Sequence, residues 1–445
     1  MKTLIKRILE DMGMWATWVV IPIIVEIVPS LIQFFKLLRK KRRPQGADLP
    51  DKLPNISMIV PVYNSSATLY ACIQSIADST YPNHLIQITV VDNGSTDDSF
   101  MVFQKVQQDF TNLRLQWMNA QQGKSKALNS AIYNSTGTYI IHIDSDGVLE
   151  TNALMNMVIA FENDLTIDAM TGVVMTQRQK IDAVKKWGLK LLCENEYCEY
   201  AQSFLAGRNI ESQSNQLFTI SGAFSGFRKS SLVRTHLYNP DTVGEDTDIT
   251  FQIRESLNGK VILCAEALFF VEPIEGLGKL YTQRQRWQRA EIEVAHIFKK
   301  SKIKISRFFS DFMVRRLILD HTFVFPRLIW YFAIFVLTLY NYSLTVIFGS
   351  IIVMYVLYVL NSLLNYCNVK MYLKSFTEER NYYKSKWYVM LTLPLYNFIC
   401  FWIRVVGLVN TMTSPTTWKS QTFTEEIEKI AATVKNDFSF KKENK

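Results

Sequence analysis

Short apolar runs rich in β-branched residues alternate with segments of helical pattern between residues 55 and 144. The runs are ISMIVPVY, QITVVD, LRLQWMN and TYIIHID, and the segments between them include ATLYACIQSIADS and KSKALNSAIYN. This alternation is typical of βαβ units, in which consecutive strands are parallel and the connecting helices cover the sheet. The sequence therefore predicts an α/β domain with a mainly parallel, Rossmann-like sheet.

Polar residues follow three of these runs. Tyr63 and Asn64 come after the first run, Asp92 after the second, and Asp144 and Asp146 after the fourth. Ligands of open α/β sheets bind beyond the carboxyl ends of the strands. We therefore expect these side chains to converge on one crevice.

Asp144 and Asp146 stand at positions i and i+2 directly after a buried run. Mg²⁺ is usually held by one or two carboxylates together with substrate phosphates. One aspartate of such a pair can reach the metal, while the other reaches a ribose or the same metal. The alternative is a solvated turn, because Asp-Gly pairs commonly form turns. The two residues alone leave both interpretations open.

Asp92 begins the segment DNGSTD, whose Ser95, Thr96 and Asp97 suit the start of a helix, so a capping turn is one interpretation. The other interpretation is that the carboxylate accepts a hydrogen bond from a base or a ribose. The later segment QGKSKALNSA lacks the glycine that a P-loop needs five residues before its Gly-Lys-Ser. Lys124 and Lys126 can still meet phosphates as point charges, or they are solvated lysines.

Two further segments carry candidate catalytic groups. A carboxylate such as Glu245 or Asp246, in TVGEDTDITF, can deprotonate a hydroxyl nucleophile, although acids also gather at helix N-termini for the dipole alone. In YTQRQRWQRAEIE, Arg286 can clamp a departing diphosphate and Trp287 can form a stacking floor for a sugar. A basic amphipathic helix on a membrane surface is the alternative for this segment, and both interpretations can hold at once.

Apolar stretches of membrane-spanning length flank this region. A first span is predicted at about residues 14–35, followed by KLLRKKRR, and three more at about 322–341, 344–364 and 387–409. The basic block belongs on the cytoplasmic side, which places the N-terminus outside and the α/β region in the cytoplasm. Three C-terminal spans would put the tail outside, whereas a re-entrant segment at Pro394 would leave it in the cytoplasm.

Composition supports a membrane protein of mixed character. The net charge of +9 lies in blocks beside apolar runs, so it indicates membrane topology rather than nucleic-acid binding. The six cysteines show no paired CxxC spacing, so neither a zinc site nor a disulfide framework is indicated.

These features divide the chain into five parts. Residues 1–54 hold the first span, its basic flank and a linker, and residues 55–275 form the α/β domain. Residues 276–321 hold interfacial helices with QRQRW, residues 322–410 hold the C-terminal spans, and residues 411–445 form a polar tail.

Taken in order, VPVYN, VVDNGSTD, DSD, ISGAF, GED and QRQRW resemble the motifs of the membrane-embedded processive family 2 glycosyltransferases. That family includes the synthases of cellulose, hyaluronan, poly-N-acetylglucosamine and chitin oligomers. The resemblance covers about residues 56–287 and the flanking spans, and QxxRW is the most specific motif. The insert at residues 188–218 and the single N-terminal span are more similar to glycosyltransferases that accompany exosortase-like systems in Gram-positive bacteria than to cellulose synthase.

The resemblance implies a cytoplasmic GT-A fold that uses a nucleotide sugar, usually UDP-linked, with Mg²⁺ or Mn²⁺. The residues that match nucleotide-sugar contacts of the family are Pro61, Tyr63, Asn64, Asp92, Lys126 and Asp144. Asp146, together with Asp144, matches the metal ligands of the DxD motif.

The remaining site residues also come from the resemblance. Asp246, helped by Glu245, matches the general base of the family. The residues that match the diphosphate and acceptor motif are Gln283, Arg286 and Trp287, and those that match the acceptor-lining loop are Ser221, Gly222 and Ala223.

The implied activity is that of a hexosyltransferase of the EC 2.4 class, which transfers sugars with inversion, processively and coupled to export. The implied setting is a multi-pass protein of the plasma membrane. The implied partners are a nucleotide-sugar donor, a glycan acceptor, the lipid bilayer and other polysaccharide-assembly proteins, and no nucleic acid. Two alternatives stay open: a non-processive transferase that adds one sugar to a lipid carrier, and a catalytically silent scaffold of a polysaccharide-export assembly.

Overall fold

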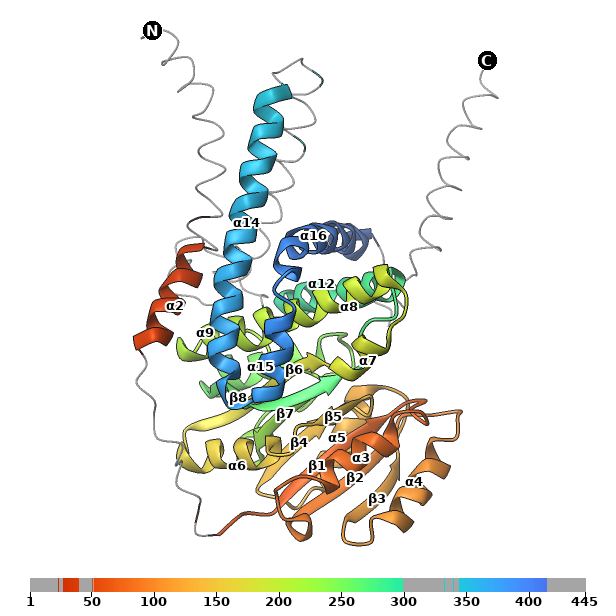
Figure 1. Cartoon of the computed structure of the whole chain (residues 1–445). Coiled ribbons are helices and arrows are strands. Elements are labelled where there is room, and N and C mark those ends of the chain that lie inside the picture. Colours follow the sequence, from red (N-terminus) through yellow and green to blue (C-terminus); the bar gives the residue numbers. More distant parts are fainter. Residues whose placement is uncertain are drawn as a thin grey trace, which may run out of the picture.

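The computed structural model describes residues 27–39, 52–298 and 344–413, together with the isolated positions 23, 50, 332 and 339. The predicted span at 322–341, most of the predicted span at 14–35 and the tail beyond residue 413 lie outside the described residues. Figure 1 shows the α/β unit in its lower half and the helices that follow it in the chain above.

The first half of the sheet is parallel, as the alternation predicts. Strands β1 (Ile56–Val62), β2 (Ile86–Asp92), β3 (Arg114–Asn119) and β4 (Tyr139–Ile143) are connected by α3 (Leu69–Ala77), α4 (Ser99–Asp109) and α5 (Lys124–Asn134). Strand β1 pairs in parallel with β2 and β4, and β2 pairs in parallel with β3. The carboxyl ends of these strands therefore point to the same edge of the sheet.

The second half of the sheet is mixed in direction. It contains β5 (Gly147–Leu149), β6 (Ile167–Thr176), β7 (Phe224–Arg228) and β8 (Lys260–Val271), and the complete order is β3-β2-β1-β4-β7-β6-β8-β5. Strand β7 runs antiparallel to β4 and β6, whereas β6 and β8 are parallel. Because Phe224 pairs with Ile143, β7 begins where β4 ends. The loop before β7 is thus brought to the carboxyl edge of the parallel strands.

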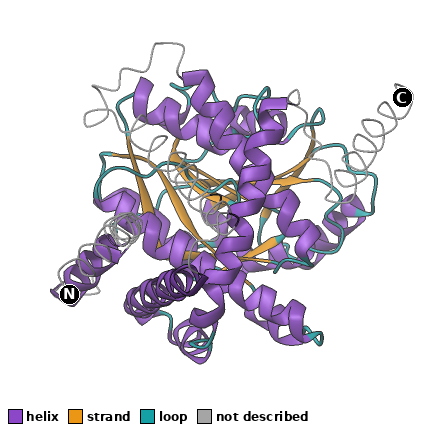
Figure 2. Ribbon diagram, turned by 90° about the horizontal axis from the view of Figure 1, so that it is seen from above, coloured by secondary structure: helices purple, strands orange, loops and turns teal. Residues whose placement is uncertain are grey.

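Apolar side chains cover both faces of the central strands. On one face, α3, α4 and α6 (Ala153–Asn163) supply side chains to one buried cluster, and on the other face α5 packs against β1, β2 and β4. Every residue of β1 is buried. This burial explains the near-continuous apolar sequence of β1, because a parallel sheet covered by helices exposes neither face. Figure 2, seen from above, shows helices surrounding the strands.

Residues 178–213 form an insert between β6 and β7. It consists of α7 (Arg178–Ala183), α8 (Trp187–Tyr200), a π-helical segment (Ala201–Gly207) and α9 (Arg208–Gln213). In α8 the acid Glu194 is buried, and it accepts hydrogen bonds from Lys386 Nζ at 2.9 Å and Tyr388 Oη at 2.7 Å. A buried charge needs such partners. The helix is therefore an internal element with polar contacts to the C-terminal helices.

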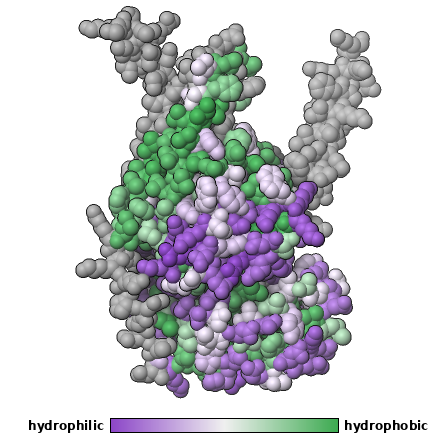
Figure 3. All heavy atoms as spheres, viewed as in Figure 1, coloured by the Kyte–Doolittle hydropathy of each residue, from purple (hydrophilic) through white to green (hydrophobic). Residues whose placement is uncertain are grey.

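Three helices follow the gap in the described residues: α14 (Leu344–Tyr372), α15 (Thr377–Ser385) and α16 (Val389–Thr413). Within the described part of the chain, Ile347–Ser375 and Val389–Gly407 are long and apolar enough to cross a membrane, with mean hydropathies of 2.1 and 1.7. The predicted spans at 344–364 and 387–409 fall in these two regions. Helix α14 projects from the α/β unit and has an apolar surface, shown in green in Figure 3. Helix α2 (Val28–Arg39) packs beside it, where Asn368 Nδ2 donates to the Ser30 carbonyl oxygen at 3.2 Å.

Helix α16 packs against helices of the α/β unit rather than projecting from it. It contacts α8 and α12 (Leu277–Phe298), over which it lies in Figure 1. Side chains of α8, including Cys193 and Tyr197, share one buried apolar cluster with Tyr383 of α15 and Leu393 of α16. The insert thus joins the sheet to the C-terminal helices. The six cysteines are free thiols, as their spacing indicates.

Candidate active site

The loops after β1 and β2 are joined by hydrogen bonds. Asn64 adopts a left-handed conformation with φ of 50°, and its side-chain oxygen accepts from Thr96 N at 2.8 Å. Asp92 Oδ1 accepts from Ser95 N at 3.0 Å, so the capping-turn interpretation of Asp92 is correct for that oxygen. The carboxylate nevertheless lies half-buried at the carboxyl edge of the sheet.

The two other residues that the sequence places after or within β1 differ in their exposure. Tyr63 has 52% of its surface exposed, which leaves its ring available to a ligand in the crevice. Pro61 is buried inside β1, where it pairs with Val91. It therefore supports the loop from within the sheet.

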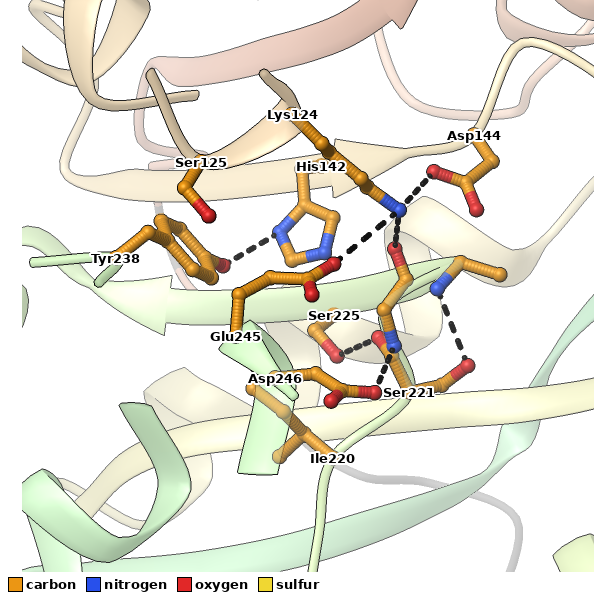
Figure 4. A network of polar contacts seen from close by, with 12 residues as sticks. Lys124, Ser125, His142, Asp144, Ile220, Ser221, Ser225, Tyr238, Glu245 and Asp246 are labelled. Carbon is orange, nitrogen blue, oxygen red and sulfur yellow. Dashed lines mark hydrogen bonds and ion pairs between the residues drawn. The ribbon is translucent and has the colours of Figure 1, made fainter. Parts of the chain in front are cut away.

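Lys124, the first residue of α5, connects the polar groups of the crevice, as Figure 4 shows. Its Nζ donates to Asp144 Oδ1 at 2.6 Å and to the Gly222 carbonyl oxygen at 2.9 Å, and it lies 3.9 Å from Glu245 Oε1. Burial alone would lower the pKa of Lys124, but the charges of Asp144 and Glu245 raise it overall. The charged ammonium group therefore draws two carboxylates and a backbone carbonyl together.

Lys126 lies on the exposed side of the same helix. Residues two apart on an α-helix point in nearly opposite directions, because each residue turns the chain by about 100°. The structure thus adds Lys124 to the network of the crevice, and the assignment of Lys126 to the donor stays a prediction.

The loop Ser221-Gly222-Ala223 links the strand-end acid to the acids of α11 (Glu245–Phe251). Asp144 N donates to the Ala223 carbonyl oxygen at 3.0 Å, and Gly222 N donates to Asp246 Oδ2 at 3.2 Å. A Cβ at Gly222 would stand 3.3 Å from Asp246 Oδ2 and 3.6 Å from Lys124 Nζ. A glycine therefore lets the loop pass close to both charged groups.

Glu245 and Asp246 occupy the first turn of α11, so the helix N-terminus interpretation holds for them as well. Burial raises the pKa of Glu245, the charge of Asp246 adds to this effect, and Lys124 opposes it. Asp246 Oδ1 accepts from Thr247 N at 2.7 Å and Oδ2 from Gly222 N. Both oxygens of Asp246 are thus oriented by backbone groups, and the carboxylate lies in the same network as Asp144 (Figure 4).

Asp146 is the carboxylate best suited to hold a divalent cation. One oxygen of Asp144 is engaged by Lys124, whereas Asp146 is exposed to the crevice. Although the residue as a whole is exposed, partial desolvation of its carboxylate and the charge of Asp144 raise the pKa of Asp146 to about 6. A cation would relieve this repulsion.

The metal-ligating side chains that are available indicate which kind of metal site fits. No cluster of three or more His, Cys, Asp or Glu side chains that could hold a metal occurs among the described residues. One or two carboxylates are what Mg²⁺ requires when substrate phosphates and water supply the other ligands.

The QRQRW motif lies in α12. Gln283 Nε2 donates to Tyr200 Oη at 3.2 Å, and Gln283 Oε1 is buried without a hydrogen-bond partner in the described structure. Arg286 is exposed, and its charge lowers the pKa of both Lys124 and Glu245, which places it on the crevice side. Helix α12 also contacts α16, and the interfacial position of this segment stays a prediction.

Trp287 packs against an aromatic pair of the insert. Its ring centroid lies 6.2 Å from that of Tyr200 and 5.8 Å from that of Phe204, with the Phe204 ring edge-on. The insert therefore supports the indole from outside the motif.

A buried pair that the sequence did not indicate lies beside Glu245 in Figure 4. Tyr238 Oη and His142 Nδ1 are 3.1 Å apart, and burial, reinforced by the charge of Lys124, lowers the pKa of His142 to about 4. The neutral imidazole therefore supports the cluster without adding charge. No motif marks Tyr238, which lies in a loop before α11.

Residues 57–234 match the profile of the family described as Glycosyl transferase family 2. The poly-beta-1,6-N-acetyl-D-glucosamine synthase of Staphylococcus aureus (strain COL) is 26% identical over 261 residues, which cover 58% of this chain and 60% of the relative. The synthase of the same name from Staphylococcus epidermidis is 26% identical over 275 residues, which cover 60% of this chain and 62% of the relative. The matches thus span about 60% of the length of these relatives.

Among solved structures, the fold is similar to that of a mannosyltransferase, PcManGT from Pyrobaculum calidifontis, in complex with GDP-Man and Mn²⁺. The TM-score is 0.54 at 15% sequence identity, and the alignment covers 87% of this chain and 96% of the other. This similarity shows that the α/β unit has the GT-A architecture. The exosortase-associated subgroup stays a prediction.

Proposed function

Because residues 57–234 match the profile of Glycosyl transferase family 2, we propose that this chain transfers a sugar from a nucleotide sugar to a growing glycan, with inversion. One observation carries the proposal: Lys124 and the Gly222 loop bring the strand-end acid Asp144 and the helix acid Asp246 into one hydrogen-bonded network. The network thus sets the segment of the candidate metal ligands Asp144 and Asp146 beside a candidate base, and such a transfer requires both kinds of group.

The donor proposed is a UDP-linked sugar, and UDP-N-acetylglucosamine is the first to test because the synthase relatives are named for that sugar. Tyr63, which is exposed, and Asp92, which is half-buried at the carboxyl end of β2, are assigned to the base and the ribose. Asp146, together with Asp144, would hold Mg²⁺ or Mn²⁺. When bound, the cation neutralises charge on the diphosphate.

Side chains of the protein take up the proton and stabilise the charge of the leaving group. Asp246 accepts the proton of the acceptor hydroxyl, whose oxygen attacks the anomeric carbon as the bond to the diphosphate breaks. Arg286 stabilises the departing diphosphate through its planar guanidinium. Gln283, whose Nε2 donates to Tyr200 Oη, is assigned with Trp287 to the acceptor end of the site. Positioning and electrostatics supply most of the rate in such a site.

The setting proposed is the plasma membrane, crossed more than once, with the α/β domain in the cytoplasm. The apolar helices α14 and α16 support this proposal, and so do the similarity to polysaccharide synthases and the basic block after residue 35. Processive elongation, coupling to export and contacts with other polysaccharide-assembly proteins are part of the same proposal. A non-processive transferase or a silent scaffold would contradict it.

The test is release of UDP from UDP-N-acetylglucosamine by the full chain in lipid nanodiscs, with a β-1,6-linked N-acetylglucosamine oligosaccharide as acceptor. We expect release with Mg²⁺ or Mn²⁺, loss of release with chelator, and loss in Asp246→Asn. Asp248→Asn is the matched control, because Asp248 lies two residues along α11 and accepts instead from Gln252 Nε2 at 2.6 Å. Release that survives in Asp246→Asn would contradict the assignment of the base.

Product length separates the remaining alternatives. Elongation by many sugars on a gel supports processivity, whereas a product that never exceeds one added sugar shows a single-transfer enzyme. No turnover with any of a panel of UDP-, GDP- and CDP-linked sugars would indicate a scaffold.

A further inference from the structure

Arg284, the second residue of QRQRW, is not among the residues that the motif assigns to substrate. It is only 1% exposed, although it carries a charge. Its guanidinium Nη2 donates to Glu199 Oε2 of α8 at 2.5 Å and to Tyr396 Oη of α16 at 3.1 Å. Three helices that are distant in sequence therefore meet at one side chain.

The contacts close into a triangle. Tyr396 Oη, which accepts from Arg284, donates in turn to Glu199 Oε2 at 3.0 Å. Each member of the triangle therefore fixes the orientation of the other two. In a low-dielectric interior such a network is strong when complete, and it leaves a costly unpaired charge when one member is removed.

The guanidinium also contacts the acceptor motif. Its central carbon lies 4.3 Å from the centroid of the Trp287 ring and 5.7 Å from that of Tyr200. A cation at this distance from an indole is attracted to the ring face, and the attraction is stronger where water is excluded. Tyr200 in turn accepts from Gln283, so both Gln283 and Trp287 are supported by the residues around Arg284.

We infer that Arg284, held by Glu199 and Tyr396, is a positioning residue that orients Trp287 and so makes acceptor binding depend on how α16 is seated against α12. Only the identification of the bound molecule as a glycan acceptor rests on the proposed function. The orientation of Trp287 is a property of the protein itself. The apolar helix α16 then acts on the reaction without reaching the substrate. Glycan binding becomes sensitive to the position of a candidate membrane helix.

The test compares two tyrosines of the C-terminal region that both reach a glutamate of α8. Tyr396→Phe removes the hydroxyl that contacts Arg284 and Glu199. Tyr388→Phe removes a hydroxyl that donates to Glu194 at 2.7 Å, and within the described parts of the chain no hydrogen bond joins that pair to Arg284. Both changes delete one oxygen, so they are matched in size and in chemistry.

The first readout needs no substrate. The full chain is labelled with 5-fluorotryptophan, and the ¹⁹F resonance of Trp287 is assigned by its absence in Trp287→Phe. We expect Tyr396→Phe to shift or broaden this resonance and Tyr388→Phe to leave it in place. If Tyr396→Phe does not fold, Glu199→Gln, with Glu194→Gln as its control, gives the same comparison. An unmoved Trp287 resonance in Tyr396→Phe, or an equal shift in both tyrosine variants, overturns the inference.

The second readout is kinetic. In Tyr396→Phe we expect the KM for the β-1,6-linked N-acetylglucosamine oligosaccharide to rise about fivefold, since one hydrogen bond to a charged network is lost. The KM for UDP-N-acetylglucosamine should stay within about twofold of wild type, because the donor residues are not touched. An equal rise of both KM values shows general structural damage and overturns the inference. Absence of turnover in the wild type would instead contradict the proposed function, while the ¹⁹F spectra still decide the role of Arg284.

Discussion

Replacing Lys124 with methionine removes a buried positive charge between Asp144 and Glu245 while it keeps the length of the side chain. The ammonium group lies 3.9 Å from Glu245 Oε1, and the side chains of Lys124 and Glu245 are 22% and 11% exposed. Two unit charges at about 4 Å interact by about 1 kcal/mol in water and about 4 kcal/mol at the effective dielectric constant near a protein surface. Since about 1.4 kcal/mol corresponds to one pKa unit, Lys124→Met should raise the pKa of Glu245 by roughly one to three units.

The direction of this pKa shift can be tested in a pH profile of activity. The pKa of Glu245 is already raised by burial, and Lys124 is the group that opposes the rise. Without the lysine, Glu245 stays protonated to a higher pH, so its support of Asp246 is lost over a wider range. We therefore expect the acidic limb of kcat/KM for UDP release, recorded between about pH 5 and pH 9, to move up by at least about one unit.

Lys126→Met is the matched control for this experiment. Lys126 lies two residues along the same helix and is exposed, so its loss should leave the acidic limb in place. Circular dichroism and the thermal midpoint show whether each variant is folded. An acidic limb that coincides with that of the wild type in folded Lys124→Met, or that moves equally in both variants, would refute the electrostatic role of Lys124.

Three other changes test separate parts of the structure. Arg286→Lys keeps the charge but loses the planar fork, so UDP release should slow by about tenfold or more, and unchanged kcat would contradict a clamp on the diphosphate. Burial raises the pKa of Glu196 from 4.5 to about 7, so the folded state binds this proton more tightly and stability should fall by about 3 kcal/mol as the pH rises through that window. In Glu196→Gln, the stability measured by thermal unfolding should no longer fall with pH in this range, and an unchanged dependence on pH would contradict the role of Glu196. Gly137→Ala would place a Cβ 2.5 Å from Ser57 N and should cost about 1–3 kcal/mol in urea unfolding, whereas Gly188→Ala meets no atom within 4 Å and should be neutral or better.

The parallel half of the sheet could be predicted from the sequence because its signal is local. The runs that alternate between residues 55 and 144 correspond to β1 to β4, with helix starts such as Lys124 found to the residue. Strand β7 had no such signal, because its neighbours β4 and β6 are chosen by pairing across distant segments. The antiparallel direction of β7, which brings the Gly222 loop to the site, could therefore not be predicted from the sequence.

The acids and the motif residues could be named from the sequence, but their partners could not. Which of Lys124 and Lys126 faces the crevice depends on how α5 is rotated about its own axis. The pattern of polar residues in this segment does not determine that rotation. The sequence gives no sign of a role for Arg284, because its partners Glu199 and Tyr396 lie 85 and 112 residues away. Burial of an arginine depends on such remote partners, and so it is decided by tertiary structure.

The contacts of α8 have a consequence for how the chain is made. Glu194 finds Lys386 only 192 residues later in the sequence, and at about 5–20 residues per second a ribosome needs roughly 10–40 seconds to reach it. Until then Glu194 lacks its cationic partner, although α8 can already pack against β6, β8 and α12. The face of α8 that contacts α15 and α16 is therefore completed last, after the C-terminal helices have been synthesised.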